Sequence, residues 1–581
     1  MNKFFYTSER NIQILIYLLK QHKIRKVVAS PGATNVTCVA SLQHDPYFEI
    51  YSSYDERSAA YLACGLARES GEAVVLSCTG ATASRNYMPG LTEAYYRKLP
   101  VLAVTSTQDI SRVGHYIPQV IDRSKQPNDI VLLSEHIQTV KDKTDEWDVT
   151  IKVNRALLEL HHRGGGPVHI NLSTTYSRDY SVKELSPARI IRRVTQTDEY
   201  PSLPNCKIGI FIGDHIKFTE EETAGIDEFC AANNAVVFCD HTSSFFGKYR
   251  VLYSLARVQR QNAPVHTNPD ILIHIGEVSG DYTNPGKAAK EIWRVSDDGE
   301  IRDTFNRLTY VFEMPEIVFF KHYIPLEYTP KETYFSACKK QLEEVRKQIP
   351  ELPFSNIWVA QQTAHRIPKN SVVHLSILNT LRSWNYFEFQ ESVQSSCNTG
   401  GFGIDGILST LVGASLVDQS KLYFAVIGDL AFFYDMNVIA NRHVGKNLRV
   451  LLVNNGKGVE FKNYDHKAAV FGDETDVYIA AAGHNGNKSK LLVKHYAEDL
   501  GFDYLSATTK EEFCQVIDKF VNPNYMEKSI LLEVFTNDVE ESNALKMIRY
   551  CSTSPAGVSK RIIKHVLGKN ATAAIKKIIG H

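Results

Sequence analysis

The sequence lacks the features that define several protein classes. Its 581 residues include no run of about 18 apolar residues, so we expect no membrane-spanning helix. The ten cysteines are scattered without a CxxC pair, which argues against a zinc site and a disulfide framework. Lys plus Arg and Asp plus Glu both number 65, so no positive field favours nucleic acid. We therefore expect a cytoplasmic protein with small-molecule partners.

Apolar segments that fit buried strands alternate with helical patterns three times along the chain. This alternation predicts parallel sheets covered by helices on both faces. The expected fold class is α/β, with three doubly wound domains at 1–185, 200–345 and 355–540. A basic tail at 541–581 follows, and 558–567 and 571–579 have the pattern of short amphipathic helices. The tail either docks on its own protein or contacts an anionic surface or a partner.

The strongest chemical signal is Gly428-Asp429-Leu430 followed by Asn454-Asn455. Each group follows an apolar strand (422–427 and 449–453), and a helix connects the two strands. In a right-handed βαβ unit both groups emerge at the same edge of the sheet, where ligands bind. A carboxylate and an amide oxygen suit Mg²⁺, which would keep further oxygen ligands from a phosphate group. The alternative is a helix N-cap at Asp429 and a polar turn at the Asn pair.

The same residues resemble a known family. Gly-Asp-x followed about 25 residues later by Asn-Asn is similar to the metal–diphosphate motif of thiamin-diphosphate-dependent enzymes, of the acetolactate synthase and pyruvate decarboxylase type. Residues 55–68 resemble the pyrimidine-domain helix of these enzymes, and 79–94 resemble the loop and helix that follow it. The resemblance implies a pyrimidine-binding, a central transhydrogenase-like and a diphosphate-binding domain, in that order.

The resemblance also implies residue roles. Glu56 would hydrogen-bond the aminopyrimidine ring and activate the cofactor, and Ile404 would hold the cofactor bent from below. Asp429, Asn455 and the backbone oxygen of Lys457 would hold Mg²⁺ on the diphosphate. Further cofactor contacts are expected from Gly32, Thr79, Asn86, Gly403, Gly428 and Leu430. From the sequence alone, Glu56 also fits an ordinary acidic residue in the first turn of a helix.

Four more residues are candidates: His115 as a second catalytic residue, and Gln119, Lys462 and His466 as substrate contacts. His115 and Gln119 lie in the loop after the first domain's third expected strand, where family members place substrate and cofactor contacts. A histidine there is suited to proton transfer near neutral pH, although a loop histidine is often only solvated. Lys462 and His466 follow the metal loop in a stretch that either closes over the site or is a mobile surface loop.

Within the superfamily, several stretches are similar to the menaquinone-pathway synthases, which join decarboxylated 2-oxoglutarate to isochorismate. Those enzymes carry three substrate arginines at positions where this chain has Ala33-Thr34, Thr107-Gln108-Asp109 and Thr399. Since arginines bind carboxylates with a planar fork of donors, their loss predicts a less anionic substrate pair.

The expected reaction is decarboxylation of a 2-oxo acid, with transfer of the resulting acyl carbanion to a carbonyl acceptor such as a keto sugar. One alternative is simple decarboxylation that releases an aldehyde. Another is an NAD-dependent oxidoreductase, because Gly401–Gly406 reads GxGxxG. In this superfamily the pyrimidine domain of one subunit faces the diphosphate domain of another, so the resemblance also implies a homodimer or homotetramer.

Overall fold

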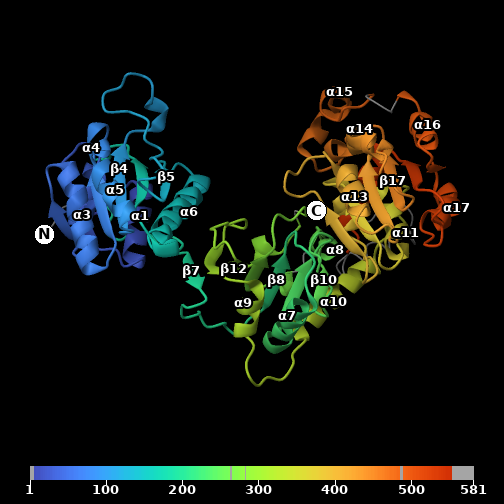
Figure 1. Ribbon diagram of the computed structural model, residues 1–581, viewed down its shortest axis with the longest axis horizontal. Helices are drawn as coiled ribbons and strands as arrows, with labels where there is room; N and C mark the ends of the chain where they lie inside the picture. Colours follow the sequence, from blue (N-terminus) through green and yellow to red (C-terminus); the bar gives the residue numbers. More distant parts are fainter. Residues whose placement is uncertain (1–4, 262–264, 282, 484–487, 553–581) are drawn as a thin grey trace, which may run out of the picture. The chain divides into compact units, whose positions relative to one another are not determined.

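The protein is described by a computed structural model that covers residues 5–261, 265–281, 283–483 and 488–552. It forms two compact units: Met1–Glu199 with Asp298–Glu313, and Tyr200–Asp297 with Met314–His581. The strand pairs described in its three sheets are parallel, and helices alternate with strands (Figure 1). This confirms the predicted α/β class. The two basic helices predicted after residue 552 lie outside the described residues.

The first unit is built on a six-stranded sheet in the order β2-β1-β3-β4-β6-β5. Two further strands of this unit, β7 and β13, pair in parallel with each other. The elements are α1 (Arg10–Gln21), β1 (Lys26–Ala29), α2 (Val36–Gln43), β2 (Glu49–Ser52), α3 (Glu56–Ser70), β3 (Val74–Cys78), α4 (Thr82–Asn86), α5 (Met88–Tyr96), β4 (Val101–Thr107), β5 (Leu133–Ile137), α6 (Lys143–Glu159), β6 (Val168–Ser173), β7 (Arg192–Thr195) and β13 (Leu308–Glu313).

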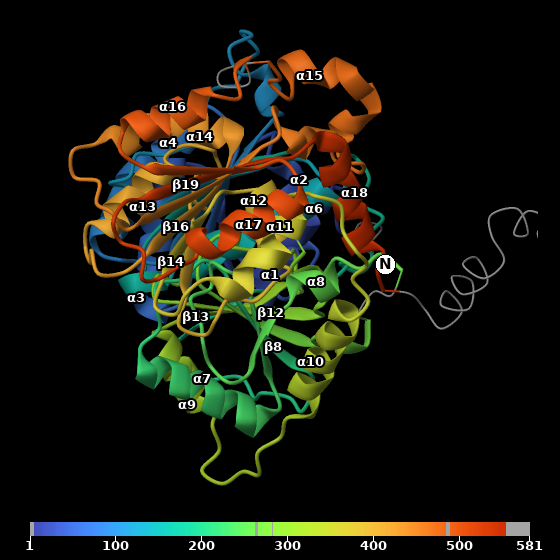
Figure 2. The same ribbon diagram turned by 90° about the vertical axis from the view of Figure 1, so that its right-hand side faces the viewer.

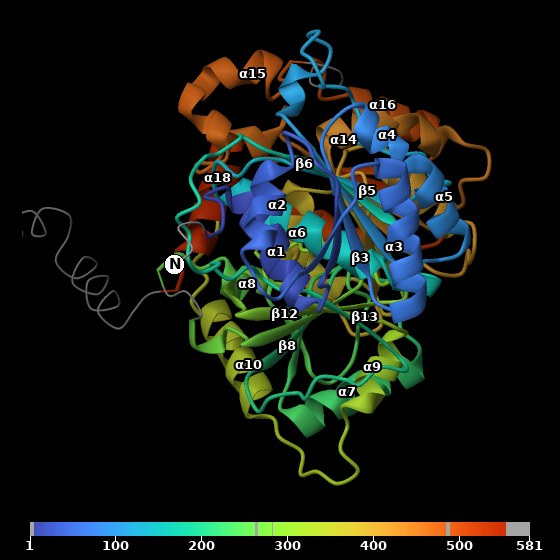
Figure 3. The same cartoon turned by 90° about the vertical axis from the view of Figure 1, so that its left-hand side faces the viewer.

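Alternate residues of this sheet enter two separate cores. Val27 and Val75 pack in one core with α1, α2 and α6, whereas Val28 and Val74 pack in the other with α3 and α5 (Figure 3). Successive strand side chains point to opposite faces, so the unbroken apolar strands need helices on both sides. Each fully buried side chain of this size contributes about 1.5–3 kcal/mol relative to an exposed one.

The second unit contains strands of a middle sheet in the order β10-β9-β8-β11-β12 and a complete six-stranded sheet. The elements around the middle strands are β8 (Ile208–Ile212), α7 (Glu220–Asn233), β9 (Val236–Cys239), β10 (Arg250–Leu252), α8 (Ser254–Arg257), β11 (Ile271–Ile275), β12 (Glu291–Ser296), α9 (Glu316–His322) and α10 (Thr333–Arg346).

The six-stranded sheet of the second unit has the order β15-β14-β16-β17-β19-β18 (Figure 2). Its elements are α11 (Asn356–Thr363), β14 (Val372–Leu375), α12 (Asn379–Trp384), β15 (Gln394–Cys397), α13 (Ile407–Ser415), β16 (Tyr423–Gly428), α14 (Asp429–Asp435), β17 (Leu448–Asn454), α15 (Thr475–Tyr478), α16 (Leu492–Asp499), β18 (Asp503–Ala507), α17 (Lys510–Phe520), β19 (Ile530–Phe535) and α18 (Asp538–Arg549).

The two six-stranded sheets follow the same path. In each, the second strand lies outside the first, the third lies on the first strand's other side, and the sixth lies between the fourth and fifth. In each sheet the chain therefore first adds a strand on one side of its first strand and then continues on the other side. This reversal lies between β1 and β3 in the first sheet and between β14 and β16 in the other. Ligands of such sheets bind at the carboxyl ends of the strands at this point.

Two general properties follow from the same structure. All ten cysteines are free thiols, and Cys514 on α17 is exposed. Within the described residues, no helix combines the length and the apolar character needed to cross a membrane.

Candidate active site

The loops after β16 and β17 meet at the carboxyl edge of the third sheet. Gly428 pairs with Val453, so Asp429 and Asn455 follow the ends of neighbouring parallel strands. Asp429 begins α14, and its Oδ1 accepts a hydrogen bond from the Leu430 backbone N–H at 2.8 Å. Its Oδ2 accepts one from the Gly456 backbone N–H at 2.7 Å, which ties the two loops together.

The oxygens at this edge suit a cation. Asp429 is only 3% exposed, and burial raises the pKa of its carboxyl to about 7 although nearby backbone N–H groups oppose the shift. The Oδ1 of Asn455 is buried and has no hydrogen-bond partner within the described chain. A buried carboxyl and an orphaned amide oxygen are hard ligands that a bound Mg²⁺ would satisfy.

A diphosphate would complete such a metal site. Among the described residues, no group of three or more His, Cys, Asp or Glu side chains could hold a metal ion. Mg²⁺ is commonly held by one or two protein carboxylates together with phosphate oxygens, and the N-terminus of α14 offers free N–H groups to the same phosphates. The residues present therefore fit a metal–diphosphate group.

Asn454 and Asn455 have different surroundings. Asn454, the last residue of β17, donates its Nδ2–H to Glu533 Oε1 at 2.7 Å on β19. The hydroxyl of Tyr504 donates to Glu533 Oε2 at 2.8 Å, and burial raises the pKa of Glu533. The Asn454 amide N–H thus fixes the end of the strand, whereas the Asn455 Oδ1 is buried without a partner in the described chain.

Lys457 and Lys462 share acidic partners. The Lys457 ammonium lies 2.7 Å from Asp476 and 3.3 Å from Asp538, and its carbonyl accepts a hydrogen bond from the Val459 N–H at 2.9 Å. A carbonyl has two lone pairs, so the Lys457 oxygen keeps one for a metal. The Lys462 ammonium lies 2.8 Å from Asp476 and is engaged within its own loop.

His466 lies at the start of a 3₁₀ helix, Lys467–Glu474. Its Nδ1 accepts a hydrogen bond from the Ala468 N–H at 3.1 Å, and its ring meets Phe461 edge to face at 5.3 Å. Together with Arg382 and Glu460, which form a two-pronged ion pair at 2.9 Å, it lines a cavity of about 200 Å³.

The glycine-rich segment before α13 is anchored from the sheet. The Nε2 of His374 bonds Asn398 Oδ1 at 3.1 Å, and Asn398 donates to the carbonyl of Gly406 at 3.3 Å. Gly406 has a φ of +69°, which favours glycine, and caps α13. Ile404 is half-buried against the core under α13, and a side chain on Gly403 would meet Asp405 at 2.9 Å.

The GxGxxG in this segment lacks the setting of a dinucleotide fingerprint. That fingerprint requires a buried strand directly before the glycines. Here the preceding strand is β15, a four-residue polar edge strand with mostly half-buried or exposed side chains. The geometry does not support a nicotinamide-dinucleotide site at Gly401–Gly406.

In the first unit, Glu56 is the first residue of α3. The preceding Asp55 caps the helix by accepting hydrogen bonds from the N–H groups of Arg57 at 2.9 Å and Ser58 at 3.3 Å. Glu56 is half-buried and has no hydrogen-bond or ion-pair partner within the described part of the chain. Because Asp55 performs the capping, the Glu56 carboxyl is free to meet a ligand.

Gly32 and Thr79 follow β1 and β3, on either side of the point where winding reverses. A Cβ on Gly32 would lie 2.3 Å from the Thr79 Cβ, so the two loops touch. Thr79 Oγ1 bonds Thr34 Oγ1 at 2.7 Å. Asn86 ends α4 and is exposed.

His115 and Gln119 lie in the loop after β4, and both side chains are exposed. The Gln119 backbone has a φ of +64°, and its carbonyl would lie 2.8 Å from a Cβ on Gly80. The loop therefore rests on the turn after β3, which brings Gln119 near Thr79.

Sequence reasoning missed Arg123, which anchors the same loop. Its side chain is buried, donates to Asn171 Oδ1 at 3.2 Å and to the Ser106 carbonyl, and keeps one NH group without a partner in the described residues. Burial lowers the pKa of this guanidinium. A single arginine in a polar loop carries no pattern that distinguishes it from a solvated one.

Known proteins match this chain both in its first unit and along nearly its whole length. Residues 11–126 match the family described as "Thiamine pyrophosphate enzyme, N-terminal TPP binding domain". Curated relatives named 2-succinyl-5-enolpyruvyl-6-hydroxy-3-cyclohexene-1-carboxylate synthase include one from Bacteroides thetaiotaomicron. It is 30% identical over an alignment of 565 residues that covers 93% of this chain and 98% of the relative. The corresponding proteins of Bacteroides fragilis and Flavobacterium johnsoniae are 29% and 28% identical over 573 and 560 residues, covering 93% and 92% of this chain and 98% and 97% of each relative.

These matches confirm the resemblance found in the motifs. They extend along nearly the whole chain and include both sheets whose carboxyl edges are described above. The chain therefore belongs to the thiamin-diphosphate-dependent enzymes, as a lyase or transferase type that resembles the menaquinone-pathway synthases.

Proposed function

We propose that this enzyme uses thiamin diphosphate and Mg²⁺ to decarboxylate a 2-oxo acid and to transfer the acyl unit to a carbonyl acceptor. When bound, the cofactor supplies the electron sink that makes loss of carbon dioxide possible. The protein supplies binding, orientation and control of protons around it.

One observation carries this proposal: the buried Asp429 carboxyl and the orphaned Asn455 oxygen at neighbouring strand ends. The Asn455 oxygen has no partner in the described chain, and the buried Asp429 carboxyl has hydrogen bonds only from backbone N–H groups and no cation beside it. A metal–diphosphate would supply the cation for both groups. We propose Asp429, Asn455 and the carbonyl of Lys457 as the metal ligands.

Glu56 is the proposed catalytic residue. Its carboxyl would hydrogen-bond a ring nitrogen of the cofactor's pyrimidine and hold a proton there. A carboxyl without an internal partner, at a helix start that another residue already caps, is available for this task. We propose Gly32 and Thr79 as contacts to the same ring, His115 as a second catalytic residue that transfers a proton, and Gln119 as a contact to the substrate.

We propose that the substrates carry less negative charge than those of the synthases that this chain resembles. Thr34 lies at one position where the resemblance expects arginine, and it is 2% exposed. Its hydroxyl forms hydrogen bonds with the Thr79 hydroxyl and, at 2.8 Å, with the Ser106 carbonyl. Gln108 and Thr399, at the other two, are uncharged; Gln108 is half-buried and Thr399 is buried. Uncharged side chains at these three positions suit a neutral acceptor such as a keto sugar better than a dicarboxylate.

We also propose that the enzyme acts as a homodimer or homotetramer. Glu56 belongs to the first unit and Asp429 to the second. In this proposal the first unit of one subunit meets the second unit of its partner, and each site draws on both chains.

The test of the function replaces Glu56 with Gln. Release of carbon dioxide from a panel of 2-oxo acids should fall at least about 100-fold, because a proton is no longer held at the pyrimidine ring. Titration with thiamin diphosphate and Mg²⁺ should still show binding within about threefold of wild type, since the diphosphate site is untouched. Glu69→Gln, an exposed residue of the same helix, is the matched control and should leave both quantities unchanged. An undiminished rate in Glu56→Gln would overturn the mechanism.

Product analysis by mass spectrometry decides the second half of the reaction. With a 2-oxo acid and a panel of keto sugars, we expect a ligated product with the mass of the sugar plus the acyl unit. An aldehyde alone, with every acceptor offered, would instead establish simple decarboxylation.

A further inference from the structure

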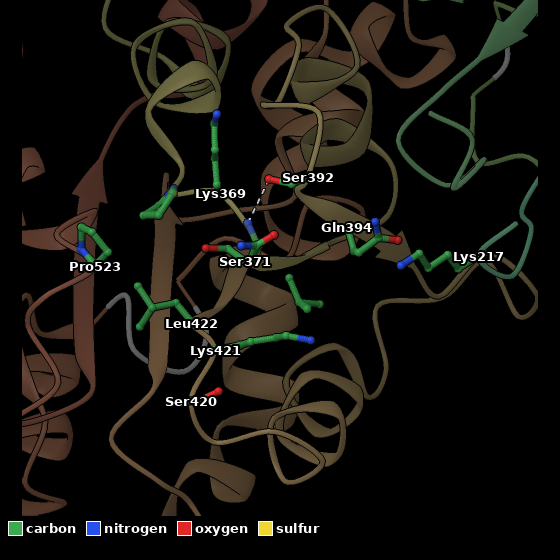
Figure 4. A pocket seen from close by; sticks show the side chains of 12 residues that line it. Lys217, Lys369, Ser371, Ser392, Gln394, Ser420, Lys421, Leu422 and Pro523 are labelled. Atoms are coloured by element: carbon green, nitrogen blue, oxygen red, sulfur yellow. Dashed lines mark hydrogen bonds between the residues drawn. The ribbon is translucent and has the colours of Figure 1, made fainter. Parts of the chain in front are cut away.

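A second pocket of about 460 Å³ opens at the opposite edge of the third sheet (Figure 4). Its walls include Val372, the first residue of β14, and Leu422, which directly precedes β16. Asp429 stands at the other end of β16, and six residues of strand span about 20 Å. This pocket is therefore separate from the site proposed for the cofactor.

The charge of the pocket is entirely of one sign. Three lysines line it, Lys217, Lys369 and Lys421, and none of the lining residues is an Asp or Glu. Lys421 lies 3.4 Å from Asp418, an exposed pair that binds weakly. Within the described residues, Lys217 and Lys369 form no ion pair. The ammonium groups of Lys217 and Lys421 leave a positive charge for a ligand to neutralise.

Polar groups between the lysines complete the wall. Ser371 is only 2% exposed, and its hydroxyl has no hydrogen-bond partner in the described chain. The Gln394 side chain also lines the pocket, and Ser392 Oγ accepts a hydrogen bond from the Asn370 N–H at 3.1 Å. In Figure 4, Lys217 and Lys421 extend from opposite sides toward the space beside Gln394, whereas Lys369 extends away from it.

A neighbouring pocket shows that this character is not a general property of the edge. That pocket, about 440 Å³, lies where β17 and β19 begin and is of nearly the same size. It contains Glu527 beside Lys446 and Lys528, and its walls include Phe502. A carboxylate thus offsets one of its two lysines, whereas no Asp or Glu lines the first pocket.

We propose that the lysine-lined pocket binds a phosphorylated sugar or nucleotide. The phosphate lies between Lys217 and Lys421, and the hydroxyls of the organic part reach Ser371 and Gln394. A volume of about 460 Å³ falls in the range of small-molecule sites and is more than an inorganic phosphate fills. The two possible sources, a free sugar phosphate and a nucleotide-linked sugar, share this chemistry.

The test is isothermal titration calorimetry on the full-length enzyme saturated with thiamin diphosphate and Mg²⁺, so that the proposed diphosphate site is already filled. The probes are glucose 6-phosphate, UDP, UDP-glucose and inorganic phosphate. We expect at least one organic phosphate to bind with a Kd below about 1 mM and more tightly than inorganic phosphate. The probe that binds best identifies the source.

Lys217→Ala combined with Lys421→Ala should weaken that binding at least tenfold, and the corresponding double change to Arg should retain it. Lys340→Ala combined with Lys347→Ala removes two exposed lysines near and at the end of α10 and should leave the Kd unchanged. The four lysines are exposed, so the fold should survive each change. Absence of binding by every organic phosphate, or equal weakening by both alanine pairs, overturns the proposal.

Discussion

The first and third sheets have the same strand order and opposite chemistry at their carboxyl edges. After β3 the chain continues with Thr79-Gly80, beside a buried guanidinium from Arg123 and a row of hydroxyls. After β16, the equivalent strand, it continues with the buried carboxyl of Asp429. The shared topology supplies loops at the point where winding reverses, and the few side chains on those loops decide which part of a ligand each edge takes.

Removing the charge of Asp429 from the carboxyl edge of the third sheet should have the largest effect on cofactor binding and activity. Asp429→Asn keeps the shape but removes the proposed anionic metal ligand, so we expect Mg²⁺-dependent cofactor binding and activity to fall about 100- to 1,000-fold. Equilibrium titration with thiamin diphosphate at fixed Mg²⁺ measures the first, and carbon dioxide release the second. Asp499→Asn, an exposed residue at the end of α16, is the control. Full binding by Asp429→Asn would remove the distinction between the two edges.

Mixing inactive variants tests whether the two edges combine between subunits. Glu56→Gln and Asp429→Asn subunits, mixed in equal amounts and allowed to exchange, form about half hybrid dimers. Each hybrid has one site with both residues intact, so activity should recover to about a quarter of wild type. If both residues of a site come from one chain, the mixture stays inactive at every ratio.

A smaller effect, on the free energy of unfolding, is expected at the tightly packed carboxyl edge of the first sheet. Gly32→Ala places a methyl group 2.3 Å from the Thr79 Cβ, and overpacking of this kind costs about 1–3 kcal/mol. Gly65→Ala on α3 has open space around the new methyl and should be neutral or stabilising by up to about 1 kcal/mol. Chemical denaturation of both variants gives the two values. The contrast fails if the two substitutions have equal effects.

The smallest effect concerns a buried ring on the third sheet. Burial lowers the pKa of His374 to about 4, so the folded protein keeps this ring neutral while the unfolded chain protonates it below about 6.5. The unfolded state binds more protons in this window, so His374 costs stability as the pH falls from 6.5 toward 4. Between pH 7 and 5, wild type should lose up to about 2 kcal/mol more than His374→Gln, measured by denaturation at each pH. A parallel loss in both proteins would contradict the assignment.

The sequence predicted much of this arrangement for physical reasons. Apolar strands alternating with helices specify a parallel sheet with two covered faces, and residues that follow neighbouring strands must share an edge. Asp429 and Asn455 could be placed together on that basis. The sequence could not separate Asn454, which bonds Glu533, from Asn455, because that difference depends on a strand 79 residues later.

Other features could not be predicted from the sequence, because they also depend on contacts between distant parts of the chain. Arg123 is buried by contacts with β4 and β6, and no local pattern indicates this. Strands β2, β5, β15 and β18 lie at or near sheet edges and include exposed or half-buried side chains, so they lack the unbroken apolar run that identifies a central strand.

The free thiols have a practical consequence. Nine of the ten are buried or half-buried, and Cys514 on α17 is exposed. A brief reaction with a maleimide dye should mark one position per chain on the native enzyme. Donor- and acceptor-labelled preparations would then report subunit exchange by energy transfer, in the same cuvette in which carbon dioxide release is followed.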